Sequence, residues 1–328
     1  VVVKEVAVEN QPTETKLTKT DITTGEELEG ATLQIINSDG EVVEEWVSTK
    51  EPHVVYALPE GEYILHDEIA PFDNGYVTAE DITFTVKEDG TVAEVEMKDD
   101  ISRLDVPKTD LVTGEELEGA TLQILDKDEK ILEEWVSTGE PHRIEKLPIG
   151  QELTLREIIA PKGFVVAEDV TFTLEDTVEV QKVEMKDDYI YGKIRIEKTD
   201  NETGDKLAGA KFEIRNKTTG EVEGTITTDA DGMAESEKLL LGTYGTDGLK
   251  KLFDYECVEV AAPEGYELNE TPIPVVFEVT EESEPIITVT LEVTNKPIPS
   301  VKSDAPKTGD VTNVIGLLGL LLAAVSCI

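Results

Sequence analysis

One long motif occurs three times in this chain. Lys19 to Ile35 begins with Lys-Thr-Asp and continues through Leu-Glu-Gly-Ala, and Lys108 to Ile124 repeats it almost unchanged. A more diverged copy runs from Lys198 to Ile214. The starting lysines are 89 and 90 residues apart, a period too long for one solenoid unit and close to the length of a small domain. The sequence therefore predicts three tandem domains of one fold.

Shorter landmarks between these motifs recur in the same order. In every copy Ala-Pro is followed by a glycine and an aromatic residue. Asp-Gly pairs typical of tight turns, at 39–40, 89–90 and 231–232, separate short apolar runs. Apolar and polar residues alternate within the runs, as in Ile82 to Val86 and Val92 to Met97. This two-residue period indicates half-buried strands. The predicted fold class is all-β, with tandem antiparallel β-sandwiches.

The composition argues against several functions. Among 328 residues, 72 Asp and Glu stand against 29 Lys and Arg, a formal net charge of −43, whereas nucleic-acid binding needs clustered cations. Two cysteines cannot supply a disulfide framework. The cysteines and three histidines are too far apart for metal-ligand spacing, so we expect no metal and no cofactor. The start lacks a methionine and a signal peptide, which indicates a mature chain or a fragment.

Each copy has three polar positions whose strand parity turns them inward. They are a lysine near the start, an acid four residues before the proline of Ala-Pro, and an Asp or Asn at the end. Residues two apart on a strand share a face. In the second copy the sets that share a face are Leu104, Val106 and Lys108; Leu153, Leu155 and Glu157; and Val183, Met185 and Asp187. In the third copy they are Ile194, Ile196 and Lys198; Tyr255, Cys257 and Glu259; and Leu291, Val293 and Asn295.

Three polar groups inside one apolar core are costly unless they pair. Burial lowers the pKa of a lysine and raises that of a carboxylic acid, so the lysine can be a neutral nucleophile and the acid a proton donor. Held together, these groups can condense into an amide between Lys and Asp or Asn, releasing water or ammonia. This is a single-turnover self-reaction, not enzymatic turnover. The alternative is a buried Lys-Asp salt bridge supported by the acid.

The three copies resemble the collagen-adhesin B-type (Cna-B, SpaA-like) repeats of Gram-positive surface proteins. Lys-Thr-Asp, Leu-x-Gly-Ala, Glu-x-x-Ala-Pro-x-Gly-Tyr and the terminal Asp or Asn carry the resemblance over nearly all of residues 13–298. It implies a prealbumin-like sandwich in which a self-formed isopeptide bond joins the first and last strands. Carried over residue by residue, the implied bonds are Lys19 to Asp99, Lys108 to Asp187 with Glu157 as catalyst, and Lys198 to Asn295 with Glu259 as catalyst.

The first copy departs from the family pattern at the catalytic acid. Asp67 stands four residues before Pro71, and its parity matches that of the apolar residues Tyr63 and Leu65. We therefore predict Asp67 as the proton donor. If the strand carries a bulge, Glu68 takes this role instead.

The repeats divide the chain into six predicted segments. Val6 to Pro12 resembles Leu291 to Pro297, so residues 1–12 are interpreted as the last strand of an upstream module, and Asn10 as a cross-link residue whose lysine is missing. The alternative is a valine-rich leader. The remaining segments are repeat 1 (13–100), repeat 2 (101–189), repeat 3 (190–298), a linker with a sorting motif (299–310) and a hydrophobic membrane segment (311–328), expected to be an anchor helix.

The C-terminal sequence resembles a sortase sorting signal. Ala305, Pro306, Lys307, Thr308 and Gly309 stand just before an apolar run from Val314 to Ile328. The family motif begins with Leu rather than Ala and ends in a basic tail that does not appear here. The resemblance implies cleavage between Thr308 and Gly309 and attachment of Thr308 to peptidoglycan or to another pilin. The alternative is an uncleaved membrane anchor.

These features together predict a secreted stalk, anchored to the cell wall, that presents an N-terminal adhesive region. The expected partners are sortase and the wall amine that receives Thr308. The first alternative is a pilin subunit, although the acceptor motif Tyr-Pro-Lys is missing. The second is a set of repeats that bind a host extracellular-matrix protein, against which the negative charge and low aromatic content argue mildly.

Overall fold

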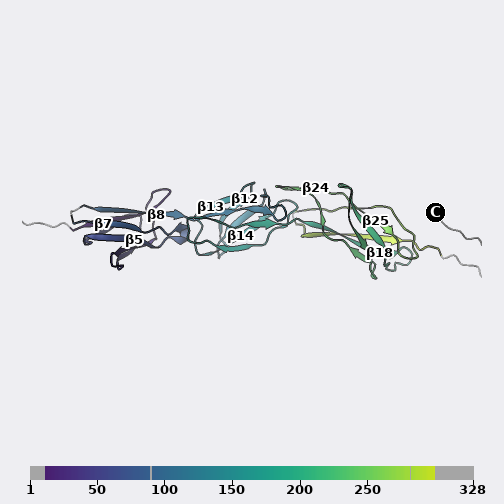
Figure 1. The fold of residues 1–328 in the computed structure, drawn as a ribbon. Coiled ribbons are helices and arrows are strands. Elements are labelled where there is room, and N and C mark those ends of the chain that lie inside the picture. Colours follow the sequence, from purple (N-terminus) through teal and green to yellow (C-terminus); the bar gives the residue numbers. More distant parts are fainter. Residues whose placement is uncertain (1–11, 89–90, 281, 300–328) are drawn as a thin grey trace, which may run out of the picture.

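Three β-sandwiches lie end to end in an elongated molecule (Figure 1). The structure is a computed structural model that describes residues 12–88, 91–280 and 282–299. These residues contain no α-helix, only the short 3-10 helix η1 (Phe72–Asn74). The predicted all-β tandem sandwich fold is confirmed, whereas the predicted anchor helix lies outside the described residues.

Every repeat is built from short strands whose side chains alternate between core and solvent. Repeat 1 contains β1 (Glu14–Asp21), β2 (Thr32–Asn37), β3 (Val42–Val47), β4 (His53–Tyr56), β5 (Gly61–Ile69), β6 (Tyr76–Val77), β7 (Ile82–Val86) and β8 (Ala93–Ile101). Repeat 2 contains β9 (Arg103–Val106), β10 (Lys108–Asp110), β11 (Thr121–Leu125), β12 (Ile131–Val136), β13 (His142–Glu145), β14 (Glu152–Ile159), β15 (Val170–Thr173), β16 (Val180–Lys182) and β17 (Met185–Asp187). Repeat 3 contains β18 (Tyr191–Asp200), β19 (Lys211–Asn216), β20 (Glu221–Thr227), β21 (Met233–Glu235), β22 (Leu239–Leu240), β23 (Gly242–Gly245), β24 (Gly248–Leu252), β25 (Tyr255–Ala261), β26 (Ile273–Val275) and β27 (Ile286–Asn295).

The first and last strands of each repeat lie side by side and run parallel. In repeat 1 the two sheets have the strand orders β4-β1-β8-β6 and β3-β2-β5-β7, and β1 pairs with β8 so that Asp21 lies opposite Asp99. The pairs β10 with β17 and β18 with β27 repeat this arrangement. Hairpin-connected strands, by contrast, pair antiparallel, as β2 does with β3. The parallel pairing places the lysine of each first strand beside the end of the last strand.

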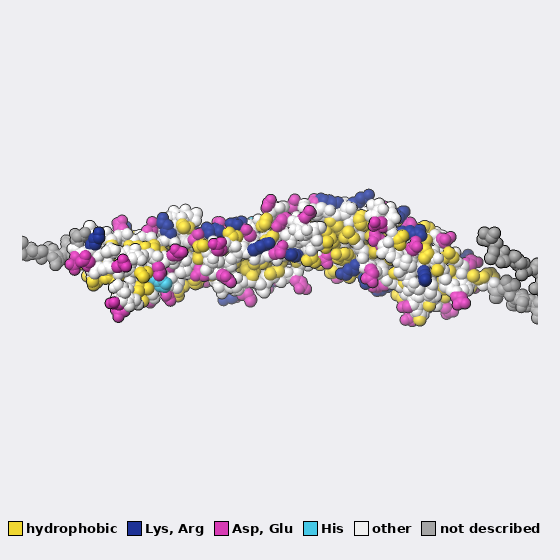
Figure 2. Space-filling model, in the orientation of Figure 1, with side chains coloured by type: hydrophobic (Ala, Val, Ile, Leu, Met, Phe, Trp, Pro, Cys, Tyr) yellow, Lys and Arg dark blue, Asp and Glu magenta, His cyan; other side chains and the backbone are white. Residues whose placement is uncertain are grey.

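A small apolar core fills each sandwich. In repeat 1 the fully buried Leu33 and Ile35 of β2 pack with Leu65 of β5 and Met97 of β8. Repeats 2 and 3 have corresponding clusters. Burying such side chains contributes roughly 2 kcal/mol each relative to leaving them in water. Figure 2 shows Asp and Glu side chains along the length of the visible face, as the net charge predicts.

A bulge follows the acid position in every repeat. In repeat 1 Leu33 pairs with Asp67 and the adjacent Thr32 pairs with Ile69, so Glu68 is the extra residue. The same register shift follows Glu157 and Glu259. A bulge adds one residue and locally disrupts the ladder. Here it leaves Asp67 facing the core and Glu68 facing solvent.

Candidate functional site: a lysine, an acid and an Asp or Asn in each core

Three lysines are among the most deeply buried side chains of the molecule. Lys19, Lys108 and Lys198 are 2%, 1% and 0% exposed. Each ends an alternating strand face whose other members are core residues, as the parity argument predicted. An unpaired ammonium group at such a position would be strongly destabilising. The side chains around each lysine therefore decide what the site does.

In repeat 2 the lysine meets two carboxyl groups. Lys108 Nζ lies 3.0 Å from Glu157 Oε1 and contacts Asp187 Oδ1. All three side chains are at most 4% exposed. The backbone N–H of Ala167 donates to Glu157 Oε2 at 2.7 Å, which fixes the carboxyl group and leaves Oε1 directed at the lysine.

Repeat 3 has an amide in place of the second carboxyl group. Lys198 Nζ contacts Asn295 Oδ1 and lies 3.7 Å from Glu259 Oε1. Asn295 Nδ2 donates to both oxygens of Glu259 at 2.9 Å. The N–H of Asn269 holds Glu259 Oε2 at 2.9 Å. The acid thus faces the nitrogen that would leave as ammonia.

Repeat 1 achieves the same arrangement with a shorter acid. Lys19 Nζ lies 2.7 Å from Asp67 Oδ2 and contacts Asp99 Oδ1. The N–H of Ala79 donates to Asp67 Oδ2 at 2.9 Å. Asp67 is 1% exposed, whereas Glu68 lies near His66 on the surface, with its Oε2 3.3 Å from the ring Nε2. The residue that meets Lys19 is therefore Asp67.

Burial shifts the pKa values of Asp187, Asp99 and Lys198 toward the neutral forms of these three groups. Burial raises the pKa of Asp187 to about 7; the Lys108 ammonium opposes this rise and the Glu157 carboxyl group reinforces it. Asp99 has its pKa raised to about 7 for the same reasons, with Lys19 opposing and Asp67 reinforcing. Burial also lowers the pKa of Lys198, against the opposing effect of Glu259. Neutral lysine is a nucleophile, and a neutral carboxyl group is a better electrophile than a carboxylate.

Several buried oxygens at these sites lack a hydrogen bond. Among the described residues these include Asp67 Oδ1, both carboxyl oxygens of Asp99, Glu157 Oε1 and Asp187 Oδ2. Buried polar atoms are nearly always hydrogen-bonded, so each such atom needs an explanation. Condensation of the lysine with Asp99 or Asp187 would remove one of these oxygens from each of the two sites as water.

The family comparison agrees with the fold and with the repeat pattern. The family described as "SpaA: Prealbumin-like fold domain" matches residues 13–101, 102–189 and 192–296. The chain belongs to this SpaA prealbumin-like family. The resemblance to SpaA-like repeats drawn from the sequence is confirmed. None of the curated proteins compared with the chain matches it.

Three solved structures are similar to this chain to different degrees. The Bacillus anthracis TIE protein is 28% identical, with a TM-score of 0.54 over 87% of this chain and 51% of its own. This chain therefore spans about half the length of that relative. BcpA, the major pilin subunit of Bacillus cereus, is 18% identical, with a TM-score of 0.46 over 88% of this chain and 100% of its own. The shaft pilin SpaA from Lactobacillus rhamnosus GG is 15% identical, with a TM-score of 0.26 over 54% of this chain and 98% of its own.

Sequence reasoning missed two groups that support each SpaA-like site. The first is the backbone N–H that holds the acid, donated by Ala79, Ala167 and Asn269. It carries no side-chain signal. The second is the aspartate of Lys-Thr-Asp, whose Oδ1 accepts turn N–H groups and whose Oδ2 accepts a tyrosine hydroxyl. The recurrence of Lys-Thr-Asp could have pointed to the aspartate, but its partner is the Gly-Tyr tyrosine in repeats 1 and 3 and Tyr189 in repeat 2, where the pair is Gly163-Phe164.

The other predicted site residues lie outside the described residues. These are Asn10 and the sorting motif Ala305, Pro306, Lys307, Thr308 and Gly309. Within the described ranges, no cluster of His, Cys, Asp or Glu suits a metal ion. The same ranges include no helix long and apolar enough to span a membrane.

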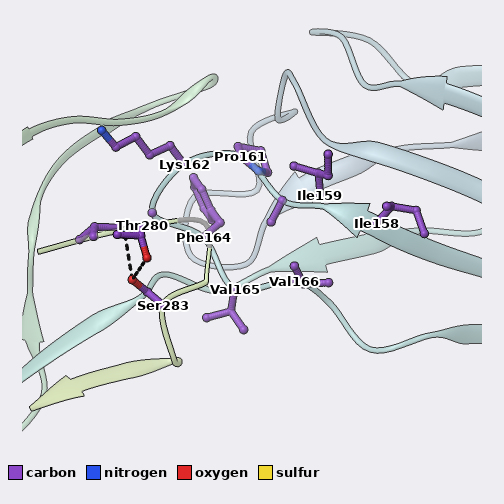
Figure 3. Close-up of a pocket in the computed structure, with 12 residues that line it drawn as sticks. Ile158, Ile159, Pro161, Lys162, Phe164, Val165, Val166, Thr280 and Ser283 are labelled. Carbon is purple, nitrogen blue, oxygen red and sulfur yellow. Dashed lines mark hydrogen bonds between the residues drawn. The ribbon is translucent and has the colours of Figure 1, made fainter.

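A groove of about 580 Å³ lies between repeats 2 and 3, away from the cross-link positions (Figure 3). Its lining includes Ile159, Phe164 and Val165 on one side and Thr280 and Ser283 on the other. None of the lysine sites opens into it. The three sites are closed interiors, which suits a reaction between the protein's own side chains.

Proposed function

We propose that this chain is a load-bearing stalk whose three repeats are each closed by a self-formed isopeptide bond. The observation that carries the proposal is the recurrence of one arrangement. In three repeats a buried lysine contacts an Asp or Asn, and a buried acid reaches either that lysine or the side-chain amide of the asparagine. A structural salt bridge would need no conserved acid held by a backbone N–H, and in repeat 3 the bonding partner is a neutral amide.

The proposed reaction balances within each site. In repeat 2, Lys108 Nζ attacks Asp187 Cγ, the C–N bond forms, and the C–O bond to the departing hydroxyl breaks. Glu157 takes a proton from the nitrogen and gives one to the departing oxygen, so one water leaves. In repeat 3, Glu259 delivers the proton to Asn295 Nδ2, and ammonia leaves. Positioning of the reacting atoms in contact replaces a costly encounter in solution.

The proposed bonds suit a molecule that is pulled from both ends. Tension along repeat 1 enters at the start of its first strand, β1, and leaves at the end of its last strand, β8. These two strands are parallel neighbours. A Lys19–Asp99 amide would carry this tension directly and leave the segment between them unloaded. The bond also closes a long loop, which by analogy with disulfides contributes about 4 kcal/mol per repeat.

The anchor and the upstream region complete the proposal. Cleavage between Thr308 and Gly309 by a sortase would attach the stalk to the cell wall, and joining of Thr308 to another subunit would make the same chain a pilin. Residues 1–12 would end an upstream module. In support, repeat 1 begins in the same way as repeat 2, which follows another module. Thr13 Oγ1 donates to Leu58 O at 2.6 Å, and Ser102 Oγ makes the corresponding hydrogen bond to Leu147 O.

Mass spectrometry of the intact chain tests the cross-links. We expect the mass to be lower than the sequence mass by two waters and one ammonia. Glu157→Ala should restore one water, because the proton carrier of repeat 2 is lost. Glu152→Ala, an exposed change on the same strand β14, should restore none. An unshifted mass in the wild-type chain would leave only buried salt bridges and would refute the proposed function.

A further inference from the structure

In repeats 1 and 2 the residue after the Gly-aromatic pair packs against the core of the following repeat. Val77 follows Gly75 and Tyr76 in repeat 1, is 3% exposed, and belongs to the core cluster of repeat 2. Val165 follows Gly163 and Phe164 in repeat 2, and packs against the core cluster of repeat 3. The first two repeats thus each place one apolar side chain across a domain boundary.

A lysine of repeat 2 fastens the first boundary from the other side. Lys146 has a left-handed backbone, with φ of 61°. Its backbone lies so close to Gly75 that a Cβ added to Gly75 would be 2.4 Å from the carbonyl carbon of Lys146. Its Nζ donates to Asp21 Oδ2 at 2.8 Å and to the Tyr76 hydroxyl at 2.9 Å. This contact joins repeat 2 to the Lys-Thr-Asp turn of repeat 1.

The second boundary is fastened by the hairpin of β23 and β24, which has no counterpart among the strands of repeats 1 and 2. Two backbone bonds tie it to repeat 2. Leu249 N–H donates to Lys162 O at 2.6 Å, and Glu118 N–H donates to Thr246 O at 2.8 Å. Figure 1 shows β24 beside the boundary between these repeats.

An aromatic cluster fills the space beneath this hairpin. The Tyr244 ring lies 4.2 Å from the Tyr189 ring and 5.5 Å from the Phe164 ring, measured between centroids. Tyr189 also donates to Asp110 Oδ2 at 2.5 Å, the bond that Tyr76 makes to Asp21 in repeat 1. Aromatic pairs of this kind contribute beyond their buried area. The second boundary is therefore largely apolar, whereas the first is closed by a charged pair.

The third repeat has the same local unit but a different third residue. Gly265 and Tyr266 are followed by Glu267, which is exposed, although Tyr266 still donates to Asp200 Oδ2 at 2.9 Å. A Cβ on Gly265 would meet nothing within 4 Å. Among the described residues, the position is thus apolar where a repeat follows and charged where none does. Terminal units of repeat arrays commonly carry such polar outer faces.

We propose that Val77 and Val165 couple repeats 1 and 2 to their successors, so that the three sandwiches form one stiff rod. Tandem domains normally move relative to one another unless their interface is extensive and apolar. Here each boundary has an apolar side chain packed against the next core, a fastening element and backbone hydrogen bonds, which at the first boundary include Ile149 N–H to Phe72 O at 3.0 Å. This coupling does not depend on the isopeptide bonds and holds whether or not they form.

Distance measurements between spin labels test the coupling. Thr49→Cys and Thr138→Cys place labels at the same exposed position of repeats 1 and 2, and Thr138→Cys with Ala230→Cys spans repeats 2 and 3. Cys257 is buried and stays unlabelled, and Cys327→Ser removes the other thiol. We expect one narrow distance distribution for each pair. Val77→Glu should abolish the narrow peak across the first boundary and leave the second unchanged, and Val165→Glu should do the reverse.

Three further variants guard against unfolding as the cause. Val92→Glu introduces the same charge at a position that is 47% exposed in repeat 1 and should change neither distribution. Lys146→Met and Tyr244→Ala remove the fastening side chains without placing a charge in a core, and each should broaden only its own boundary. Hydrogen exchange of β2, β11 and β19 shows whether each sandwich remains folded. Broad distributions in the wild-type chain, or narrow ones in all four boundary variants, would overturn the proposal.

Discussion

His66 and Arg156 occupy the same position in two closely similar repeats, one residue before the buried acids Asp67 and Glu157. Arg156 forms a two-pronged ion pair with Asp169, its Nη2 donating at 2.7 Å. His66 meets the corresponding Asp81 through Nδ1 at 2.6 Å and also lies near Glu68. The hydrogen bond to Asp81 raises the pKa of His66, burial opposes the rise, and the Asp81 and Glu68 charges reinforce it. Repeat 1 therefore has a titratable histidine at this position, whereas repeat 2 has an arginine that stays charged.

The shifted pKa of His66 makes the stability of the folded state depend on pH. A histidine whose pKa is higher in the folded state stabilises that state below its unfolded pKa of about 6.5, and the contribution is lost as pH rises through the raised folded value. We expect His66→Arg to match the wild-type chain at about pH 5.5 and to be the more stable of the two at about pH 8. Urea unfolding of both chains across this range measures the difference. A gap that stays constant with pH would show that His66 contributes nothing by titration.

At the scale of strands, the bulge decides which acid enters the core. Asp67 pairs with Leu33, and the extra residue after it is Glu68. We therefore expect Asp67→Ala to abolish the water loss of repeat 1 and Glu68→Ala to leave it unchanged. Peptide mass spectrometry of the Lys19–Asp99 cross-link measures both. Loss of the cross-link in Glu68→Ala alone would mean that the strand shifts register before the bond forms.

The strands also show how far sequence reasoning extends. The two-residue alternation fixed which side chains face the core, including Lys108, Glu157 and Asp187, because parity is a local property. It could not give the parallel pairing of β1 with β8, since partner direction depends on contacts between distant residues. The same limit hid the Ala167 N–H that holds Glu157. Val77 looks like an ordinary core residue in sequence, and only the structure assigns it to the core of the next repeat.

At the scale of the whole molecule, the proposed amide bonds and the coupled boundaries would carry a pulling force through only a few residues of each repeat. Tension along repeat 2 would pass from Arg103 to Lys108, cross the amide to Asp187, and continue into β18. Lys108 and Asp187 are 79 positions apart in sequence, and the chain between them would stay outside this route. Once the hydrogen bonds between two parallel strands begin to break, the strand pair alone resists further separation poorly. A covalent amide does not break at the force that separates the strands.

Single-molecule pulling on the ends of the chain makes this measurable. The wild-type chain should lengthen without unfolding steps from the three sandwiches. Lys108→Ala removes one amide and should release about 270 Å in a single step, the extended length of the 79-residue segment at roughly 3.4 Å per residue. Lys130→Ala, on the loop before β12, keeps the amide and should release nothing. If the wild-type chain itself gives steps of this size, the sandwiches are held by hydrogen bonds and ion pairs, and the load-bearing role of Lys108 fails.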